Sequence, residues 1–486
     1  MQQLTKKYGL FTAICMVVGI VIGSGVFFKA QDVLSVTGGN ALTGTLAWIV
    51  GGAVMVIMAS TFAQMATKYE KINGVVDYAE AIVGRRYAYY IGWFVCSIYY
   101  PAMTSVLAWV SARYTMVAVF GVSSVSPEAL FSSECILIAA FYLITIYFIN
   151  ALAPKLAGKF QISTTVIKLV PLVFIALIGT IIGLANGTLA TNFSELGTVA
   201  SEATGGGGFF AALCCTAFAY EGWIIATTIN AEIRDAKRNL PLALLIGSLI
   251  TVGIYVLYYI GVLGLANTET LMSEGTSVAF LYFGEGIASL INFLIIFSCL
   301  GTLNGLTMGC SRGFYSLAAR NEAIRPDVFD QVDKKTNVPH NAAVLSLFFC
   351  GIWFMYFLGG QFFGWFGEYA FDSSELPIVT IYPLYIPILV LFMKKGKEFT
   401  VFQRFVLPSL GILSCLLMVV ASIFRHKISN LYYLIVFAVF MLVGALFDRK
   451  DGHTFAEILY CKITGKPLSA VAAKTAEGAS DEETMN

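Results

Sequence analysis

Twelve apolar stretches, most of them about as long as a bilayer-spanning helix, constrain this chain more than any other feature. A membrane helix needs about 20 predominantly apolar residues. Only 12 % of the residues are charged, roughly half the share found in soluble proteins. We therefore expect an all-α polytopic membrane protein with 12 transmembrane helices. The expected spans are residues 9–36, 42–66, 84–120, 133–152, 160–185, 207–232, 240–265, 287–318, 341–359, 375–393, 402–423 and 428–447.

Lysine and arginine are confined almost entirely to every second loop. Lys6 and Lys7 precede the first span, and basic residues return between spans 2 and 3, 4 and 5, 6 and 7, 8 and 9, and 10 and 11. The alternate loops 121–132, 186–206, 266–286 and 360–374 contain no Lys or Arg. Because positive residues stay cytoplasmic, we expect both termini inside, in a plasma (bacterial inner) membrane. Arg425 and Lys427, in the last outer loop, are exceptions.

Several other classes of protein and site are excluded by composition. A net charge of +1 gives no sign of a nucleic-acid partner, so we expect contact only with lipid and a small molecule. Most of the ten cysteines lie in apolar spans without CxxC or histidine-paired spacing, and the chain has three histidines. We therefore expect no metal, no cofactor and no catalytic constellation. The apolar run after Lys7 has no small-residue cleavage site, so we interpret it as a retained span.

Polar breaks interrupt one apolar span near the start of each half of the chain. Gly23-Ser24-Gly25 lies in the first span, and residues 218–222 lie in the sixth. Unsatisfied backbone costs several kcal/mol per group in lipid, so such breaks persist only in protein or beside a cavity. Breaks at matching positions of two halves indicate a transporter's binding site. Span 1 runs outward and span 6 inward, which predicts an inverted five-plus-five repeat. The expected divisions are a cytoplasmic N-terminus (1–8), repeat one (9–185), repeat two (207–393), two added helices (402–447) and a disordered cytoplasmic tail (448–486).

Three ordered motifs resemble those of a known family. They are Gly19-Ile-Val-Ile-Gly-Ser-Gly-Val-Phe27, Phe218-Ala-Tyr-Glu-Gly-Trp223 with the loop 231–241, and Gly301-Thr-Leu-Asn-Gly305 with Ser311-Arg312 and Ala319-Arg320. This pattern resembles the amino acid–polyamine–organocation (APC) superfamily, in its L-type amino acid transporter branch and bacterial relatives. The resemblance implies a LeuT-like fold and transport of free amino acids, often by exchange. It does not imply an accessory subunit.

The breaks suit the two charged ends of an amino acid. The half-helix that begins after Gly25 directs its positive N-terminus and free N–H groups at a carboxylate. Carbonyls of Ile20 and of the half-helix ending near Phe218 suit an ammonium. The alternative is that the glycines serve only close helix packing. By resemblance, Phe218 covers the substrate from outside, and Tyr255 lies near the substrate. The candidate substrate-binding residues are Ile20, Gly23, Ser24, Gly25, Val26, Phe218, Ala219, Tyr220, Gly222 and Tyr255.

Two ionisable residues inside spans bear on coupling and specificity. Lys168 lies roughly 12 Å from the cytoplasmic end of span 5 at the helical rise per residue, so snorkelling to the interface is strained. In sodium-coupled relatives of the fold, a sodium lies near that place, and an ammonium there would substitute for it. Proton coupling through Lys168 is the alternative. Glu221 either stays charged and favours cationic side chains, or is protonated and hydrogen-bonds the broken backbone.

These observations predict a sodium-independent secondary transporter, an exchanger of neutral L-amino acids that works by alternating access. A proton-coupled amino acid symporter is the alternative on the same fold. A channel would show charged rings or repeated carbonyl loops, and neither is visible in the sequence. A membrane-embedded enzyme would need the catalytic constellation excluded above.

Overall fold

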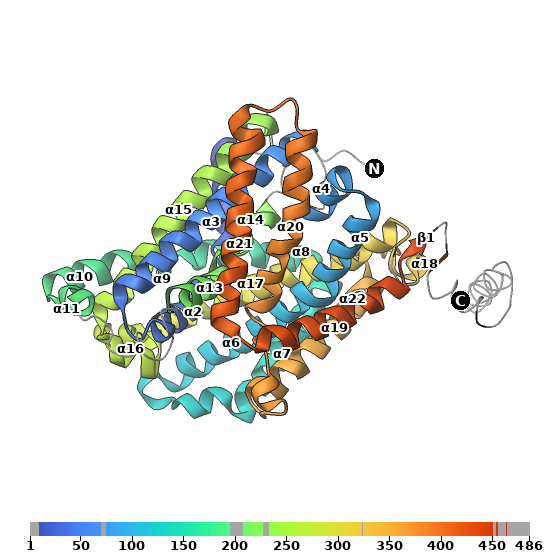
Figure 1. Cartoon of the computed structure of the whole chain (residues 1–486). Coiled ribbons are helices and arrows are strands. Elements are labelled where there is room, and N and C mark those ends of the chain that lie inside the picture. The colour runs from blue at the N-terminus through green and yellow to red at the C-terminus, as the bar shows by residue number, and fades with distance from the viewer. Residues whose placement is uncertain are drawn as a thin grey trace.

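The protein is an all-α polytopic membrane protein. Its computed structural model describes residues 9–69, 74–194, 208–226, 233–322, 324–450, 453–454 and 463. Ten helical segments of this part are long and apolar enough to cross a membrane, and a bent helix pair adds an eleventh. Figure 1 shows these helices packed around one another. Residues 1–8, the expected cytoplasmic N-terminus, lie outside the described part.

Helices of the first half follow the expected spans to within a few residues. They are α1 (Leu10–Val21), α2 (Gly25–Val36), α3 (Ala41–Lys68), α4 (Val75–Ile82), α5 (Arg85–Phe94), the π-helical turn η1 (Val95–Tyr99), α6 (Tyr100–Phe120), η2 (Val122–Ser124), η3 (Pro127–Phe131), α7 (Ser133–Leu152), α8 (Pro154–Ile167), α9 (Leu169–Phe174), the π-helical turn η4 (Ile175–Gly179), α10 (Thr180–Ala185) and α11 (Thr188–Ser194). The loops expected between spans therefore contain short helices, among them α4 and η2.

Helices of the second half show the same agreement. They are α13 (Gly208–Tyr220), α14 (Trp223–Ala226), α15 (Ala236–Leu265), α16 (Thr268–Glu274), η6 (Thr276–Phe283), α17 (Glu285–Ala319), α18 (Pro326–Phe329), α19 (His340–Gln361), η7 (Gly367–Tyr369), α20 (Leu376–Lys395), η8 (Phe402–Val406), α21 (Leu407–His426) and α22 (Ser429–Leu446). The sixth expected span holds α13 and α14, and its remaining residues, 227–232, are outside the described part.

Only a fragment of the expected tail belongs to the described part. Two short strands, β1 (Arg449–Lys450) and β2 (His453–Thr454), pair antiparallel there. The Arg86 guanidinium bonds Asp448 at 2.9 Å, which ties the start of the tail to α5. Apart from Ile463, the other residues of the tail, for which we expect disorder, lie outside the described part.

Two helical paths are interrupted at the places where the sequence carries its polar breaks. The chain leaves the helix between α1 and α2 and bends by 51°. A second interruption, at Glu221 and Gly222, separates α13 from α14. Gly222 has a φ of 108°, in the left-handed region that favours glycine. Both interruptions lie inside the protein, which is where unpaired membrane backbone is tolerated.

Glycines join the fifth and seventh spans closely. A Cβ on Gly179 would overlap the backbone of Gly261, and one on Gly264 would overlap the backbone of Gly179. The π-helical turn η4 and helix α15 therefore meet backbone to backbone. Small residues allow this kind of close approach between membrane helices. We call these contacts the glycine seam.

Candidate functional site

A cavity of about 410 Å³ lies at the two breaks. Its lining includes Gly23 and Gly25 from the first break and Phe218 and Glu221 from the second. From there it follows α5, η1, α6 and the C-terminal half of α17 as far as Leu317. We call the side with the basic loops the inner side and the opposite side the outer side. The cavity extends from the breaks toward the inner side.

Two side chains from other helices hold the first break in place. The Tyr255 hydroxyl of α15 accepts a hydrogen bond from the Gly23 N–H at 3.3 Å and donates one to the Val21 carbonyl at 3.2 Å. The Lys168 ammonium, between α8 and α9, donates to the Gly19 carbonyl at 2.5 Å. Lys168 is buried and lines the cavity. Backbone groups that the missing helical turn leaves free are therefore taken up by side chains.

The two breaks contact each other at their glycines. A Cβ on Gly25 would overlap the backbone of Ala219 and would lie 3.1 Å from a ring carbon of Phe218. A Cβ on Gly222 would lie 3.2 Å from the Ile20 carbonyl oxygen. The N-terminus of α2 and the C-terminus of α13 therefore meet at the cavity, which brings N–H donors and carbonyl acceptors to one place.

Phe218 lines the cavity and contacts aromatic and basic side chains of α2, the half-helix that runs toward the outer side. Its ring packs edge to face against Phe28, with centroids 6.0 Å apart, and Phe28 packs in the same way against Trp109. The Lys29 ammonium lies 5.5 Å from the Phe218 centroid, within cation–π range. An aromatic layer therefore separates the cavity from the outer side.

Most of the predicted substrate-binding residues line the cavity, but three do not. Those that do are Ile20, Gly23, Ser24, Gly25, Phe218, Ala219 and Gly222. Val26 is buried in α2, and Tyr255 holds the first break. The Tyr220 hydroxyl donates to the Trp48 carbonyl at 2.8 Å, so its side chain points toward α3. These three residues support the site rather than face its cavity.

The cavity also contains residues that were not among the predicted ones: Gln161, Tyr99, Tyr100, Thr302 and Arg312. A Cβ on Gly23 would lie 3.2 Å from the Thr302 hydroxyl, so α17 approaches the first break closely. Thr302 and Arg312 belong to the eighth-span motifs that carry the family resemblance. That motif was the available signal for them, whereas Tyr99 and Tyr100 have none in a single sequence.

Glu221 brings a carboxylate to the cavity wall. Its Oε1 is buried and has no hydrogen-bond partner among the described residues. Tyr99 hydrogen-bonds the carboxyl group. With Lys168 and Arg312, Glu221 gives this cavity both basic and acidic side chains.

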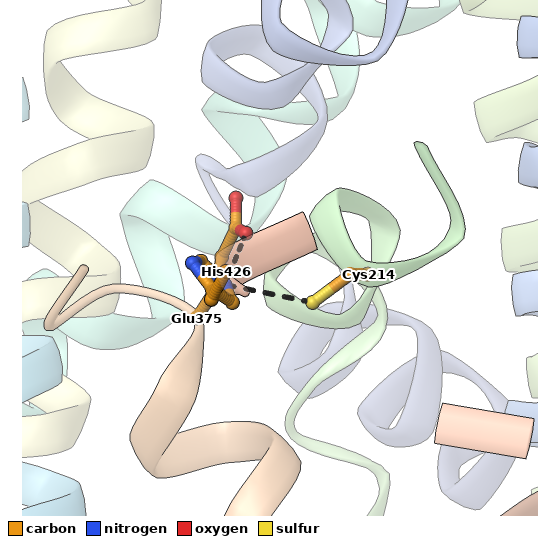
Figure 2. Close-up of side chains that lie close together, drawn as sticks. All are labelled: Cys214, Glu375 and His426. Atoms are coloured by element: carbon orange, nitrogen blue, oxygen red, sulfur yellow. Dashed lines mark hydrogen bonds and ion pairs between the residues drawn. The ribbon is translucent and has the colours of Figure 1, made fainter. Parts of the chain in front are cut away.

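Three possible metal ligands converge outside the cavity, although no metal-binding spacing is visible in the sequence. Cys214, Glu375 and His426 place their ligand atoms within 4.8 Å of one another (Figure 2). They come from α13, the start of α20 and the end of α21. Nine cysteines of the described part are free thiols.

Several known proteins similar to this chain are amino acid transporters or exchangers. A family model described as amino acid permease matches residues 8–446. The serine/threonine exchanger SteT of Bacillus subtilis is 29% identical over 323 residues, 66% of this chain and 69% of that protein. The b(0,+)-type amino acid transporter 1 of Mus musculus is 26% identical over 453 residues, 92% of this chain and 88% of that protein. The large neutral amino acids transporter small subunit 2 of Homo sapiens is 27% identical over 358 residues, 71% of this chain and 63% of that protein. With its paired helix breaks beside a cavity, the chain belongs to the amino acid permease family of the APC superfamily and is a transporter, not an enzyme.

Proposed function

We propose that this transporter is a sodium-independent exchanger of neutral L-amino acids that works by alternating access. Exchange is supported by the similarity to SteT, a serine/threonine exchanger, and neutral substrates by the similarity to the large neutral amino acids transporter. The inner side is the cytoplasm in this proposal, with both termini there and the protein in the plasma (bacterial inner) membrane. The cavity is then open toward the cytoplasm.

The substrate's two charged ends bind at the crossing of the breaks. Its carboxylate faces the N-terminus of α2, where Gly23, Ser24 and Gly25 present backbone N–H groups. Its ammonium faces carbonyls at Ile20 and at the end of α13, and the side chain extends toward α6 and α17. Phe218 covers the bound molecule from the outer side. Segments 9–185 and 207–393 form the inverted repeat whose relative rocking exposes this site to each side in turn.

Sodium independence rests on the ammonium group of Lys168. It lies 2.5 Å from the Gly19 carbonyl at the first break, and no carboxylate of the described part pairs with it. A buried cation on a backbone carbonyl supplies the charge and the contact that a bound sodium ion would make. Transport then needs no dissolved cation to complete the site.

Counterflow in proteoliposomes tests this proposal. Vesicles loaded with each of the twenty amino acids in turn are given radiolabelled L-alanine, with sodium or choline outside. We expect uptake only with a transported neutral amino acid inside, at the same rate in both salts. Uptake that requires a sodium gradient, or that proceeds equally into empty vesicles, would contradict the proposal.

A proton-coupled symporter is the second candidate, because the buried Oε1 of Glu221 lies unpartnered at the cavity wall. In that case an inward proton gradient drives uptake into empty vesicles, and Glu221→Gln abolishes the effect. The same variant separates the two states of Glu221. If the carboxylate is charged, Glu221→Gln weakens lysine uptake relative to alanine uptake. If it is protonated, the ratio stays unchanged.

A further inference from the structure

Three helices meet on one buried carboxylate on the outer side of the site. Glu375, which directly precedes α20, is 0% exposed. Its Oε1 lies 2.6 Å from the Lys29 ammonium of α2. Its Oε2 lies 3.3 Å from Nε of Arg425 and 3.1 Å from Nε2 of His426, both at the end of α21. We call Lys29, Glu375, Arg425 and His426 the outer cluster.

Neighbouring groups complete the polar surroundings of Lys29. Its ammonium also contacts Asp32 at 3.1 Å and the Ser374 hydroxyl at 3.1 Å. Asp372 accepts a hydrogen bond from the Glu375 N–H at 3.3 Å and fixes the start of α20. Because Lys29 also lies over the Phe218 ring, the outer cluster contacts the aromatic cover of the cavity directly.

Figure 2 shows Cys214, Glu375 and His426 close together, with dashed lines that join His426 to each of the other two, which raises the question of a metal site. The Cys214 sulfur lies 3.7 Å from Nε2 of His426, a spacing that ligands of one zinc ion can have. Glu375, however, already carries two cationic side chains, Lys29 and Arg425. A divalent ion would add a third positive centre beside them. The contacts of Glu375 therefore favour an ion-pair cluster over a metal site.

A buried ion pair resists separation because either partner alone leaves an uncompensated charge. The outer cluster thus fastens α2, which begins at the first break, to α20 and α21. Helices α20 and α21 lie side by side, and α13 contacts both (Figure 1). Helix α21 lies outside the expected repeats, yet its last residues contact Glu375, the carboxylate that holds the half-helix framing the site.

We propose that the outer cluster is a latch whose closure keeps the cavity shut on its outer side and whose opening lets α2 move away from α20 and α21. The latch rests on the alternating access proposed above. Closed, it keeps Phe218 under Lys29 and over the site. Opened, it releases α2 together with the aromatic layer, so the strength of the cluster sets the balance between inward-open and outward-open states.

Hydrogen–deuterium exchange of the full chain in nanodiscs tests the latch without any substrate. Lys29→Met keeps a side chain of similar length but removes the charge. We expect amide exchange in α2 (Gly25–Val36) to rise by roughly tenfold, while exchange in α4 and α5 (Val75–Phe94) falls as the inner side closes. Opposite changes on the two sides indicate a shift between states, whereas general destabilisation raises exchange on both.

Lys68→Met is the matched control. Lys68 also lies 2.6 Å from a carboxylate, that of Glu398, but these side chains are 28% and 49% exposed. We expect no change in α2 from this variant. Unchanged exchange in α2 of Lys29→Met, or an equal rise on both sides, would overturn the latch.

Arg425→Met provides a second, milder variant that leaves the Lys29–Glu375 pair in place. It should shift exchange in the same directions by a smaller factor, and a shift in the reverse direction would overturn the latch. The latch would also be overturned if zinc slowed amide exchange around the outer cluster in the wild type and Cys214→Ser removed that effect. A metal would then be the partner of Glu375. Sodium-dependent uptake would contradict the proposed function, but it would not change the interpretation of the hydrogen–deuterium exchange results.

Discussion

Two buried lysines lie on opposite sides of the first break and are compensated in different ways. Lys168, beside the cavity, is hydrogen-bonded to a backbone carbonyl and faces no carboxylate of the described part. Lys29, beyond the aromatic cover, contacts two carboxylates and a hydroxyl. A carbonyl solvates a cation without neutralising it, whereas a carboxylate neutralises it and ties two helices together. One lysine can therefore act as a resident cation, and the other as a fastener.

The largest effect is expected on the fastened side. Glu375→Gln leaves Lys29 and Arg425 buried without their shared counter-charge, so we expect a loss of about 3–5 kcal/mol of stability. Lys29→Met should cost less, because Glu375 keeps Arg425. Thermal denaturation in detergent, followed by size-exclusion chromatography, measures both variants. Equal melting temperatures for wild type and Glu375→Gln would show that the cluster contributes no stability.

Lys168→Ala tests the other lysine. It removes a charged hydrogen bond from the first break, worth about 1.5–3 kcal/mol, so we expect exchange flux to fall roughly 10- to 100-fold. Substrate binding, measured by scintillation proximity, should change less than flux. Lys159→Ala, which changes an exposed lysine on the same span, is the control. Unchanged flux in Lys168→Ala would favour an ammonium that merely reaches the membrane interface.

A comparison of Tyr255 with Tyr220 tests whether hydrogen bonds to the first break matter more for transport than a buried hydrogen bond elsewhere. Tyr255→Phe removes the hydroxyl that bonds Gly23 and Val21. Each of these hydrogen bonds is worth about 0.5–1.5 kcal/mol, so we expect the KM for exchange to rise by at least roughly 3- to 10-fold, the effect of losing one of them. Tyr220→Phe removes one buried hydrogen bond to Trp48 and should leave the KM unchanged. Equal KM changes in the two variants would remove the distinction between them.

The smallest effect is expected at a third lysine, which supplies a baseline for the comparison. This lysine is Lys68, and its ammonium donates a hydrogen bond to the Glu398 carboxylate. The bond holds the pKa of Glu398 below the ordinary value of a glutamate, but both side chains are partly exposed. Such pairs contribute about 0–1 kcal/mol. Lys68→Met should therefore leave the melting temperature within about 2 °C of wild type. A loss as large as that of Lys29→Met would mean that burial does not distinguish the pairs.

Much of the fold was predictable because membrane spans are encoded locally. A run of apolar residues predicts a helix wherever it lies in the chain, so the observed helix ends differ little from the expected ones. The breaks were predictable for the same reason, since glycine and polar residues stand out in an apolar run. Short helices such as α4 and α16 were not expected, because they lie in polar loops without a 20-residue signal.

The site was predictable only in part, because side-chain direction depends on tertiary contacts. Tyr220 and Ala219 are neighbours in sequence, yet one side chain points toward α3 and the other residue lines the cavity. The outer cluster was not visible at all, since Lys29, Glu375 and His426 are far apart in the chain. Arg425 had looked like an exception to the charge rule for loops, and it is a partner of Glu375.

The glycine seam has a mechanical consequence for the first break. Lys168 and Tyr255, which both hold that break, come from the fifth and seventh spans, and these spans meet backbone to backbone at Gly179, Gly261 and Gly264. Helices in such close contact slide past each other only with steric overlap. We therefore expect the two anchors to move as one rigid body. Tilting of α1 would then strain both hydrogen bonds together, so we expect the break to be released in a single cooperative event rather than in two independent ones.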